Sequence, residues 1–583
     1  MNDISRSALC SSTTDDPHLF CILFDKSLRS ILNHHAPVLH KTVTTRPRVP
    51  WINDEILTAK RYRRKAERRW RASRSTTDLL SFRLCRNRVT FLMNKARCAY
   101  YTNLVSENCL NQRKLFSACK SLLNLSKCAS LPLHSNPSQL ANDFGKFFRD
   151  KINSIRLEIA GQRCSSGVSD SHLALYGPSF SEFRLLSETE VLKLIKSSTK
   201  TTCSLDPIST KLFTECLDVL LTPITKLINL SLESGCFPLL WKRALVKPLL
   251  KKDGLDPIFK NYRPVSNLAY ASKLVETVVA KQLQHYLFTS DLFPILQSAY
   301  RPNHSTETAL LKVTNDILLN MNDQRVTLLL LLDLSAAFDT VDHDTLLHRL
   351  QFTFGVNGKV LSWLSSYLSG RSQQIAINET LSAEFELNCG VPQGSCLGPL
   401  LFTLYSSKLF EIIKHHFPTV HCYADDTQVY ISFCPNDSLD QLNAAELLES
   451  CIDDIRAWML HDNLKQNDEK TELLIIGTPQ QLDKVVITHI RVGNTNIYPV
   501  PVARNLGSWF DANISMTDHI SKICTSSFYY LYNLRRIRKY LSNKSTESLI
   551  HAFISTRLDY CNSLLYGLPN CSLIKLQRAE CLC

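Results

Sequence analysis

The feature that most constrains this chain is an aliphatic run that ends abruptly in an aspartate. Residues 326–332 read Val-Thr-Leu-Leu-Leu-Leu-Leu, and Asp333 follows at once. A short apolar run of this kind is typical of a buried β-strand and is far too short to cross a bilayer, which takes about 20 residues. An ionised carboxylate at the end of such a strand is costly unless it is paired or binds a cation. The run therefore predicts a buried strand that presents a functional carboxylate.

A second acidic feature is the pair Asp425-Asp426 in the centre of Val420–Ser432, where apolar and polar residues alternate on both sides. The alternation predicts a half-buried β-hairpin. Together with Asp333, the pair would supply three carboxylates, and oxygen ligands of this kind suit Mg²⁺. Two such ions can clamp the attacking and leaving oxygens of a phosphoryl displacement, so the pattern predicts nucleotidyl transfer. The alternative is an ordinary turn, because aspartate is common in turns.

Between about Leu230 and Gly507, predicted helices alternate with predicted strands, which indicates an α/β or α+β fold with acidic residues at strand ends. The helices include Thr345–Phe352 and Leu397–Phe410. The predicted strands are Ala244–Leu250, Val326–Leu334, Gln373–Ile377, Thr419–Tyr423, Gln428–Ser432 and Glu472–Ile476.

The region before this fold is helical and strongly basic. In Lys60–Arg74, nine of fifteen residues are Lys or Arg and the only acid is Glu67, within a chain of net charge +14. A solvated helix face usually mixes charge signs, so we favour contact with nucleic-acid phosphates, with Tyr62 and Trp70 as stacking surfaces. A solvated face remains the alternative. The basic residues proposed for this contact are Arg61, Arg63, Arg64, Lys65, Arg68 and Arg69.

Other features set the broad class of the protein. The 21 cysteines form no CxxC pair, which indicates reduced intracellular thiols, and no signal peptide is recognisable. Residues 161–182 are rich in Ser and Gly and predict a linker. Ser187 and Glu190 form a predicted capping box for a helix over Val191–Ser197.

Three ordered motifs closely resemble motifs A, B and C of reverse transcriptases. They are Leu332–His343 (LDLSAAFDTVDH), Gly390–Leu400 (GVPQGSCLGPL) and Tyr423–Asp426 (YADD). Three flanking segments resemble the polymerase of LINE-type (non-LTR) retrotransposons, particularly the jockey-like and related branches. These are Asn261–Asn267, Asn463–Glu472 and Arg504–Gly507. The resemblance covers roughly residues 185–570.

The resemblance implies an α+β right-hand polymerase, with fingers, palm, thumb and a basic helical N-terminal region. It would be an RNA-directed DNA polymerase that extends a DNA 3′-OH on an RNA template with deoxynucleoside triphosphates and two Mg²⁺ ions. The expected segments are 1–45 (weakly patterned), 46–160 (basic and helical), 161–184 (linker), 185–240 (polymerase extension), 241–508 (fingers and palm) and 509–583 (thumb).

The resemblance also assigns roles to particular residues. Asp333, Asp425 and Asp426 would bind the metal ions, with the Leu334 carbonyl as a possible extra ligand. Phe338 would exclude ribonucleotides at the sugar 2′ position, and an ordinary core phenylalanine is the less favoured alternative. Gln393 and Gly394 would line the incoming nucleotide and template, where glycine allows close backbone approach.

Four basic residues complete the implied site. Lys247 and Arg263 would contact the triphosphate, and Arg504 belongs to a segment that resembles the primer grip. Lys470 matches a lysine proposed to protonate the leaving pyrophosphate. For Lys247 and Lys470, an ordinary solvated lysine is the alternative.

Two departures from the family pattern shape the expectations. No endonuclease precedes the polymerase motifs, so we expect a copy shortened at both ends, with an endonuclease missing or supplied separately. Ser508-Trp509 replaces the small aliphatic residue that relatives tend to have after the glycine. The rival hypotheses are a degenerate fragment that binds nucleic acid without polymerising and an intron maturase or telomerase-like enzyme.

Overall fold

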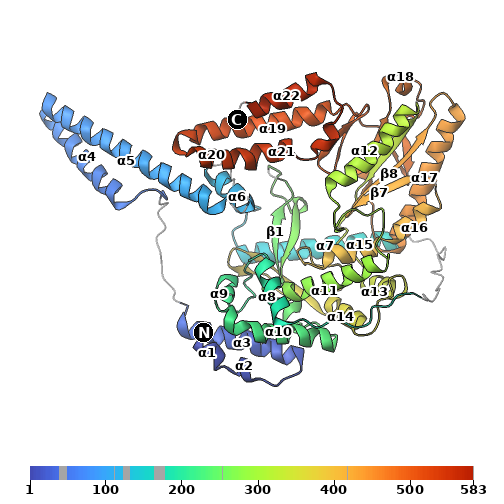
Figure 1. Ribbon diagram of the computed structural model, residues 1–583, viewed down its shortest axis with the longest axis horizontal. Helices are drawn as coiled ribbons and strands as arrows, with labels where there is room; N and C mark the ends of the chain where they lie inside the picture. Colours follow the sequence, from blue (N-terminus) through green and yellow to red (C-terminus); the bar gives the residue numbers. More distant parts are fainter. Residues whose placement is uncertain are drawn as a thin grey trace. The chain divides into compact units, whose positions relative to one another are not determined.

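The computed structural model describes residues 1–38, 49–109, 112–122, 131–162, 177–252, 254–416 and 418–581. The chain divides into two compact units (Figure 1). Unit 1 comprises Met1–Val38 and Ala129–Leu506, and unit 2 comprises Leu39–Cys128 and Gly507–Cys583. Most of the predicted linker at 161–184 lies outside the described residues.

The centre of unit 1 is a four-stranded antiparallel sheet in the order β7-β8-β3-β9. The leucine run forms β3 (Val326–Leu332), which pairs with β8 (Asp426–Phe433) on one side and β9 (Glu472–Ile476) on the other. Its side chains are buried on both faces, with only Leu331 partly exposed. Because a fully apolar strand must be covered on both faces, the sequence correctly predicted this position, and β7 (Thr419–Tyr423) has the predicted bounds.

Helices cover this sheet. Helix α12 (Thr306–Asn322) packs against β3 and β7, and α17 (Ser438–His461) packs against β8. The predicted helix at 397–410 is two helices, α15 (Gly398–Tyr405) and α16 (Lys408–Lys414), because the chain turns at Ser406-Ser407. The neighbouring helices are α13 (His343–Phe352) and α14 (Gly358–Leu368).

A second sheet in unit 1 has the order β2-β1-β4-β5, and β6 also pairs with β4. Its strands are β1 (Arg243–Leu250), β2 (Tyr262–Asn267), β4 (Arg371–Ile377), β5 (Thr380–Leu381) and β6 (Phe385–Leu387). The sequence did not predict β2, which contains Pro264. The proline is tolerated because β2 lies at the sheet edge, where one row of backbone amides needs no partner.

The remaining elements of unit 1 are mostly helical. The predicted capping box is confirmed: the Ser187 hydroxyl and the Glu190 carboxylate cap the N-terminus of α8 reciprocally. The other elements are α1 (Asn2–Ser5), α2 (Ala8–Ser11), α3 (Pro17–His35), α7 (Pro137–Gln162), α8 (Glu188–Ser197), α9 (Thr210–Glu215), α10 (Leu217–Ser234), α11 (Tyr270–Thr289), α18 (Pro479–Leu482), β10 (Ile490–Val492), β11 (Thr495–Ile497) and β12 (Val502–Asn505).

Unit 2 joins two segments that are far apart in the sequence. Helices α4 (Asp54–Ser73) and α5 (Thr76–Asn108) pack against each other, and Tyr101 and Val105 of α5 share a core with Leu531, Leu549 and Phe553. The other elements are α6 (Gln112–Leu122), β13 (Ser508–Asp511), α19 (Thr517–Ile537), α20 (Asn543–Ile550), α21 (Thr556–Leu558) and α22 (Asn570–Cys581).

The region 46–160, expected as one basic helical segment, is therefore divided between the units. Helices α4 to α6 belong to unit 2, whereas α7 belongs to unit 1. The reason is the apolar face of α7, whose Phe144 and Phe148 share a core with Tyr262 and Ile375 of the second sheet. The apolar face of a helix predicts that the helix is buried, but neither this face nor the basic composition shows which element it packs against.

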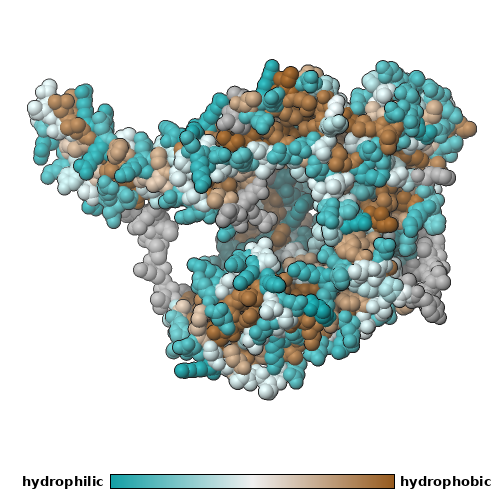
Figure 2. Space-filling model, in the orientation of Figure 1, coloured by the Kyte–Doolittle hydropathy of each residue, from teal (hydrophilic) through white to brown (hydrophobic). Residues whose placement is uncertain are grey.

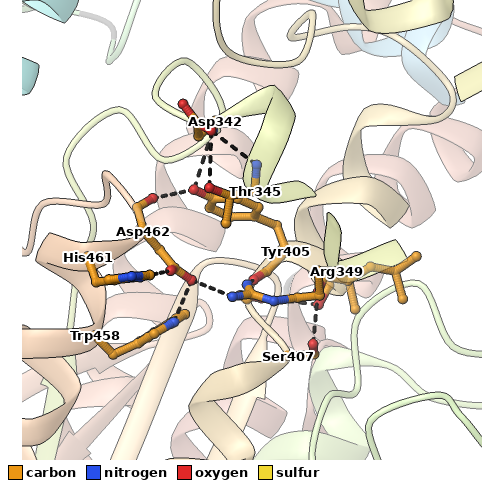
Figure 3. A network of polar contacts seen from close by, with 11 residues as sticks. Asp342, Thr345, Arg349, Tyr405, Ser407, Trp458, His461 and Asp462 are labelled. Atoms are coloured by element: carbon orange, nitrogen blue, oxygen red, sulfur yellow. Dashed lines mark hydrogen bonds and ion pairs between the residues drawn. The ribbon is translucent and has the colours of Figure 1, made fainter. Parts of the chain in front are cut away.

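A buried polar network links α13, α15 and the C-terminal end of α17 (Figure 3). Arg349 of α13 and Asp462 form an ion pair of 2.7 Å, with 8% and 0% of the side chains exposed. Asp462 also accepts a hydrogen bond from the Trp458 indole at 2.5 Å, and the Tyr405 hydroxyl donates to its backbone carbonyl. Each member is satisfied by another, which is the condition under which a buried charge is tolerated.

In the part of the chain that the structure describes, no helix is long and apolar enough to span a membrane. The cysteines described are all free thiols.

Candidate active site

The three predicted carboxylates emerge at the same end of neighbouring strands. Asp333 follows the last residue of β3, and Leu332 pairs with Thr427 of β8. Asp426 pairs with Tyr423 across a two-residue turn, so Asp425 stands at its tip. The two aspartates therefore lie at a tight hairpin turn, as the alternative of an ordinary turn also predicts. Strand pairing, however, brings it beside Asp333, which an isolated turn would not predict.

The turn is held by a residue that the sequence analysis did not identify. Gln297 is buried, and its side-chain amide accepts a hydrogen bond from the Ala424 amide (2.9 Å) and donates one to the Ala424 carbonyl (3.2 Å). Ala424 has a left-handed backbone, with φ of 58°. A non-glycine residue in this conformation persists only when its surroundings fix it. The signal in the sequence, a glutamine after a helix, is too common to have indicated this role.

The electrostatics of the three carboxylates are coupled. Asp426 is exposed at the start of β8, but partial desolvation of its carboxyl group still raises its pKa to about 6, and the charges of Asp425 and Asp333 add to the effect. Burial raises the pKa of Asp425 as well, and the charge of Asp333 again contributes. Both shifts report carboxylates that lack sufficient nearby positive charge.

Two residues from the β9 side contact Asp333. Leu331 pairs with Glu472, so the residues just before β9 lie opposite Asp333. Lys470 Nζ donates to Asp333 Oδ2 at 2.8 Å, and Asn467 Nδ2 donates to the same oxygen at 3.1 Å. The sequence predicted a role for Lys470, whereas Asn467 was not singled out. Within the described ranges, no group of three or more His, Cys, Asp or Glu side chains is arranged to hold a metal ion, and Asp333 is engaged by these two donors instead.

The acidic cluster opens into a cleft of about 1130 Å³. Asp333 and Asp425 line it, as do the predicted residues Leu334, Phe338, Gln393, Gly394, Arg263 and Lys470. Phe338 is half-buried, with its ring 4.8 Å from that of Phe402, so its packing is compatible both with the core alternative and with a wall of the cleft.

Gln393 is fixed by a second residue that the sequence analysis missed. Its Nε2 atom donates to both carboxylate oxygens of Asp339, at 2.9 and 3.0 Å. Desolvation raises the pKa of Asp339 to about 6, while this hydrogen bond and the charge of Lys151 act in the opposite direction. The contact orients the Gln393 amide at the edge of the cleft.

Gly394 occupies a position that only glycine fits. Its φ is 124°, and a Cβ atom there would lie 2.4 Å from the carbonyl oxygen of Ser266 in β2. The preceding Gln393 carbonyl accepts a hydrogen bond of 2.7 Å from the Ser266 amide. The loop is therefore docked closely on the second sheet, whereas the expected close approach to nucleotide and template stays a prediction.

The two predicted triphosphate ligands have different environments. Arg263 is exposed and lines the cleft, but Lys247 is exposed on β1 and is not among the lining residues. Lys251, at the end of the same strand, lines the cleft instead. The two lysines are four positions apart, so strand alternation places them on the same side, and their different positions along the chain decide which one reaches the cleft.

The family model for reverse transcriptase (RNA-dependent DNA polymerase) matches residues 249–530. This segment is therefore similar to reverse transcriptase domains. The match contains the four-stranded sheet and, with it, Asp333, Asp425 and Asp426. The α+β prediction is confirmed by this antiparallel sheet and the helices packed against it.

Related proteins come from jockey-like non-LTR elements. The chain is 28% identical over 335 residues to a probable RNA-directed DNA polymerase from transposon BS of Drosophila melanogaster, covering 55% of this chain and 35% of that protein. It is also 28% identical over 250 residues to the RNA-directed DNA polymerase from mobile element jockey of the same species, covering 42% and 26%. The chain thus spans about a third of the length of such relatives.

Among solved structures, apo telomerase from Candida tropicalis, truncated from the C-terminal domain, is similar with 14% identity and a TM-score of 0.31. The alignment covers 47% of this chain and 54% of the telomerase chain. A telomerase from the same organism with a telomeric RNA fragment gives 12% identity and the same TM-score, covering 59% and 57%.

The residues predicted to bind nucleic acid on α4 and β12 do not line the cleft. Arg504 is exposed on β12 and does not line the cleft. In unit 2, the basic residues on α4 are mostly exposed, and in the part of the chain described here none of the six named above forms an ion pair with an acid. Figure 2 shows mainly hydrophilic atoms along α4 and α5, with a few apolar patches.

The aromatic residues of this basic helix differ from each other. Trp70 stacks on Phe82 of α5, with centroids 5.6 Å apart and ring planes 1° from parallel. Its ring is therefore partly used within the helix pair, whereas 65% of Tyr62 is exposed. Tyr62 is the better stacking surface of the two.

Proposed function

We propose that this chain is an RNA-directed DNA polymerase that extends a DNA 3′-OH on an RNA template with deoxynucleoside triphosphates. The observation that carries the proposal is the position of Asp333, Asp425 and Asp426 at the same end of paired strands, with Asp333 and Asp425 lining a cleft, within the segment that matches the reverse transcriptase family. The names of the relatives support it. That an endonuclease is missing or supplied separately stays a prediction.

A divalent cation fits the chemistry of these three side chains. Reverse transcriptases are nucleotidyltransferases, which generally use divalent metal ions, and the raised pKa of Asp425 and Asp426 reports carboxylates that positive charge would stabilise. We propose two Mg²⁺ ions held by the three aspartates, with the Leu334 carbonyl as a further ligand. When bound, the ions would activate the 3′-OH and offset charge on the phosphates.

The remaining residues would bind and orient the substrates. Phe338 would contact the sugar at its 2′ position, and the Asp339 contact would hold the Gln393 amide toward the nucleotide. Gly394 would let the backbone approach the base pair. Arg263 would bind the triphosphate bidentately, whereas for Lys247 the solvated alternative gains support from its place outside the cleft.

Lys470 would act in proton transfer. Its ammonium group already lies within the acidic cluster, 2.8 Å from Asp333. A lysine beside the leaving group can donate a proton to pyrophosphate, which makes it a better leaving group. The segment 241–508 would form fingers and palm and the helices after residue 509 a thumb, with Arg504 as part of the primer grip.

Primer extension on an RNA template with the full chain tests this proposal. We expect incorporation by the wild type and no detectable incorporation by the Asp425→Ala/Asp426→Ala double variant. Equal incorporation by both would refute the assignment of the site.

The alternative is a fragment that binds nucleic acid without polymerising, and the unpaired cations of α4 favour it as a second candidate. Since each released counterion contributes to the salt dependence, binding of an RNA duplex should weaken steeply between low and moderate salt. The two candidates differ in one respect: only the first predicts nucleotide incorporation at low salt.

A further inference from the structure

Helix α7 precedes the reverse transcriptase domain in the sequence, yet it forms one wall of the cleft. Residues at helical spacing, including Phe147, Lys151, Ser154 and Glu158, line the same cleft as Asp333 and Gln393. Spacings of three and four residues place side chains on one helix face. This face belongs to a segment that the family match does not include.

The helix is held at both ends of this wall. Toward its N-terminus, the Phe144 ring lies 4.7 Å from that of Phe259 and 5.1 Å from that of Tyr262. Toward its C-terminus, Arg156 Nη2 lies 2.9 Å from Asp342 Oδ2, and Glu158 pairs with Lys465. These contacts join α7 to the second sheet and to residues next to the four-stranded sheet. The helix is therefore an ordered part of unit 1.

Lys151 is the cation of α7 best placed to act in the cleft. It is half-buried and lines both the cleft and the small adjoining cavity beside Asp339 and Gln393. It makes no hydrogen bond or ion pair with any residue in the described ranges. The nearby acids of the helix are engaged elsewhere, because Glu158 pairs with Lys465 and Asp150 lies 3.7 Å from Arg149.

Other cations face the same space. Burial lowers the pKa of Lys251, and the like charges that add to the effect are, in order, Lys151, Lys470 and Arg263. All four side chains line the cleft. Lys470 is paired with Asp333, which leaves Lys151, Lys251 and Arg263 as the cations that a bound polyanion would stabilise, and the Lys ammonium group binds phosphate well.

We propose that Lys151, together with Lys251, binds phosphate groups of the polymerase substrate, so that the cleft is completed by a helix outside the reverse transcriptase domain. The proposal rests on the proposed function. The phosphate would belong either to the incoming deoxynucleoside triphosphate or to the nucleic-acid backbone. Both sources offer the same chemistry, and binding measurements distinguish them.

The test compares full-length Lys151→Ala and Lys151→Met with Arg149→Ala, a matched control on an exposed part of the same helix. Calorimetry would measure binding of Mg·dTTP and, separately, of a poly(rA)/oligo(dT) duplex, neither of which requires turnover. Loss of a charge-assisted contact should weaken one of them by about tenfold or more. Lys151→Met keeps the side-chain length, which guards against a packing defect.

The outcomes separate the sources. Weaker dTTP binding with unchanged duplex binding assigns the triphosphate, and the reverse result assigns the backbone; either supports the proposal, provided that Arg149→Ala binds normally. Unchanged binding of both ligands by folded Lys151→Met would overturn it. Binding is measured without turnover. A chain that binds both ligands but incorporates no nucleotide would contradict the proposed function, and the binding data would still show whether Lys151 contacts phosphate.

Discussion

Lys470 Nζ lies 2.8 Å from Oδ2 of Asp333, although the two residues are 137 positions apart in the sequence. The pairing of β3 with β9 creates this contact. If Lys470 donates a proton during turnover, Lys470→Ala should lower kcat by about 100-fold or more and change the KM for nucleotide little. Single-turnover incorporation measures this. A lysine with only a solvated role predicts an unchanged kcat.

Gln297 should act as a positioning residue for the catalytic turn. Gln297→Leu removes both hydrogen bonds to Ala424 and should lower kcat by up to about 100-fold through misplacement of Asp425. KM, duplex binding and the unfolding temperature should change much less. The matched control is Ser298→Ala, which removes a contact to His421 at 2.9 Å and should leave kcat near the wild-type value. Equal losses in both variants would contradict a specific role for the amide.

Gly394 should not tolerate a side chain. Gly394→Ala forces a Cβ atom against the Ser266 carbonyl at a φ of 124°, and we expect a loss of unfolding free energy of about 1–3 kcal/mol. Gly161→Ala is the control, because a Cβ there meets nothing within 4 Å and alanine favours the helix. Denaturant unfolding compares the two. Similar stability of both variants would show that the loop relaxes without strain.

The buried pair of Arg349 and Asp462 should matter strongly for stability. Arg349→Met leaves Asp462 as a buried charge without its guanidinium partner, which should cost about 3–5 kcal/mol of unfolding free energy. Lys211→Ala, which removes an exposed pair of 3.9 Å with Glu215, should cost less than about 1 kcal/mol. A small effect at Arg349 would mean that water or rearrangement satisfies Asp462.

Asp339 predicts a pH dependence of stability. Its pKa is about 6 in the folded protein and near 3.8 in the unfolded chain, so the folded state binds a proton more tightly. Below about pH 4 the carboxyl is neutral in both states, and as the pH rises through about 6 the folded state bears the cost of ionisation. Relative to Asp339→Asn, the wild type should therefore lose on the order of 2 kcal/mol between pH 4 and 7. Parallel stability curves for the two proteins would contradict this.

Local patterns in the sequence predicted much of the four-stranded sheet and the carboxylates at its strand ends. The leucine run predicted β3, because a strand buried on both faces is apolar throughout. Alternation predicted the hairpin, because a strand buried on one face alternates apolar and polar residues. The motif resemblance then predicted that Asp333 lies near Asp425 and Asp426. The predicted boundaries were wrong where tertiary packing determines the end of a helix, as at the break between α15 and α16.

The partners of those residues could not be predicted in the same way. Gln297, Asp339 and Asn467 each act through one long-range hydrogen bond or pair of bonds, and a single polar residue carries no periodic signal. Likewise, the sequence did not show how far along β1 the cleft lies, and Lys251 lines it whereas Lys247 does not. The role of α7 was hidden because its basic residues resemble those of α4, while its aromatic face selected a different unit.

Single-nucleotide incorporation into a DNA primer on an RNA template, with wild type and Asp333→Asn compared at equal duplex occupancy, tests the central claim most directly. We predict that the wild type incorporates the complementary deoxynucleotide and that Asp333→Asn binds the duplex equally well but incorporates nothing measurable. Incorporation by Asp333→Asn at the wild-type rate would contradict the proposed catalytic site.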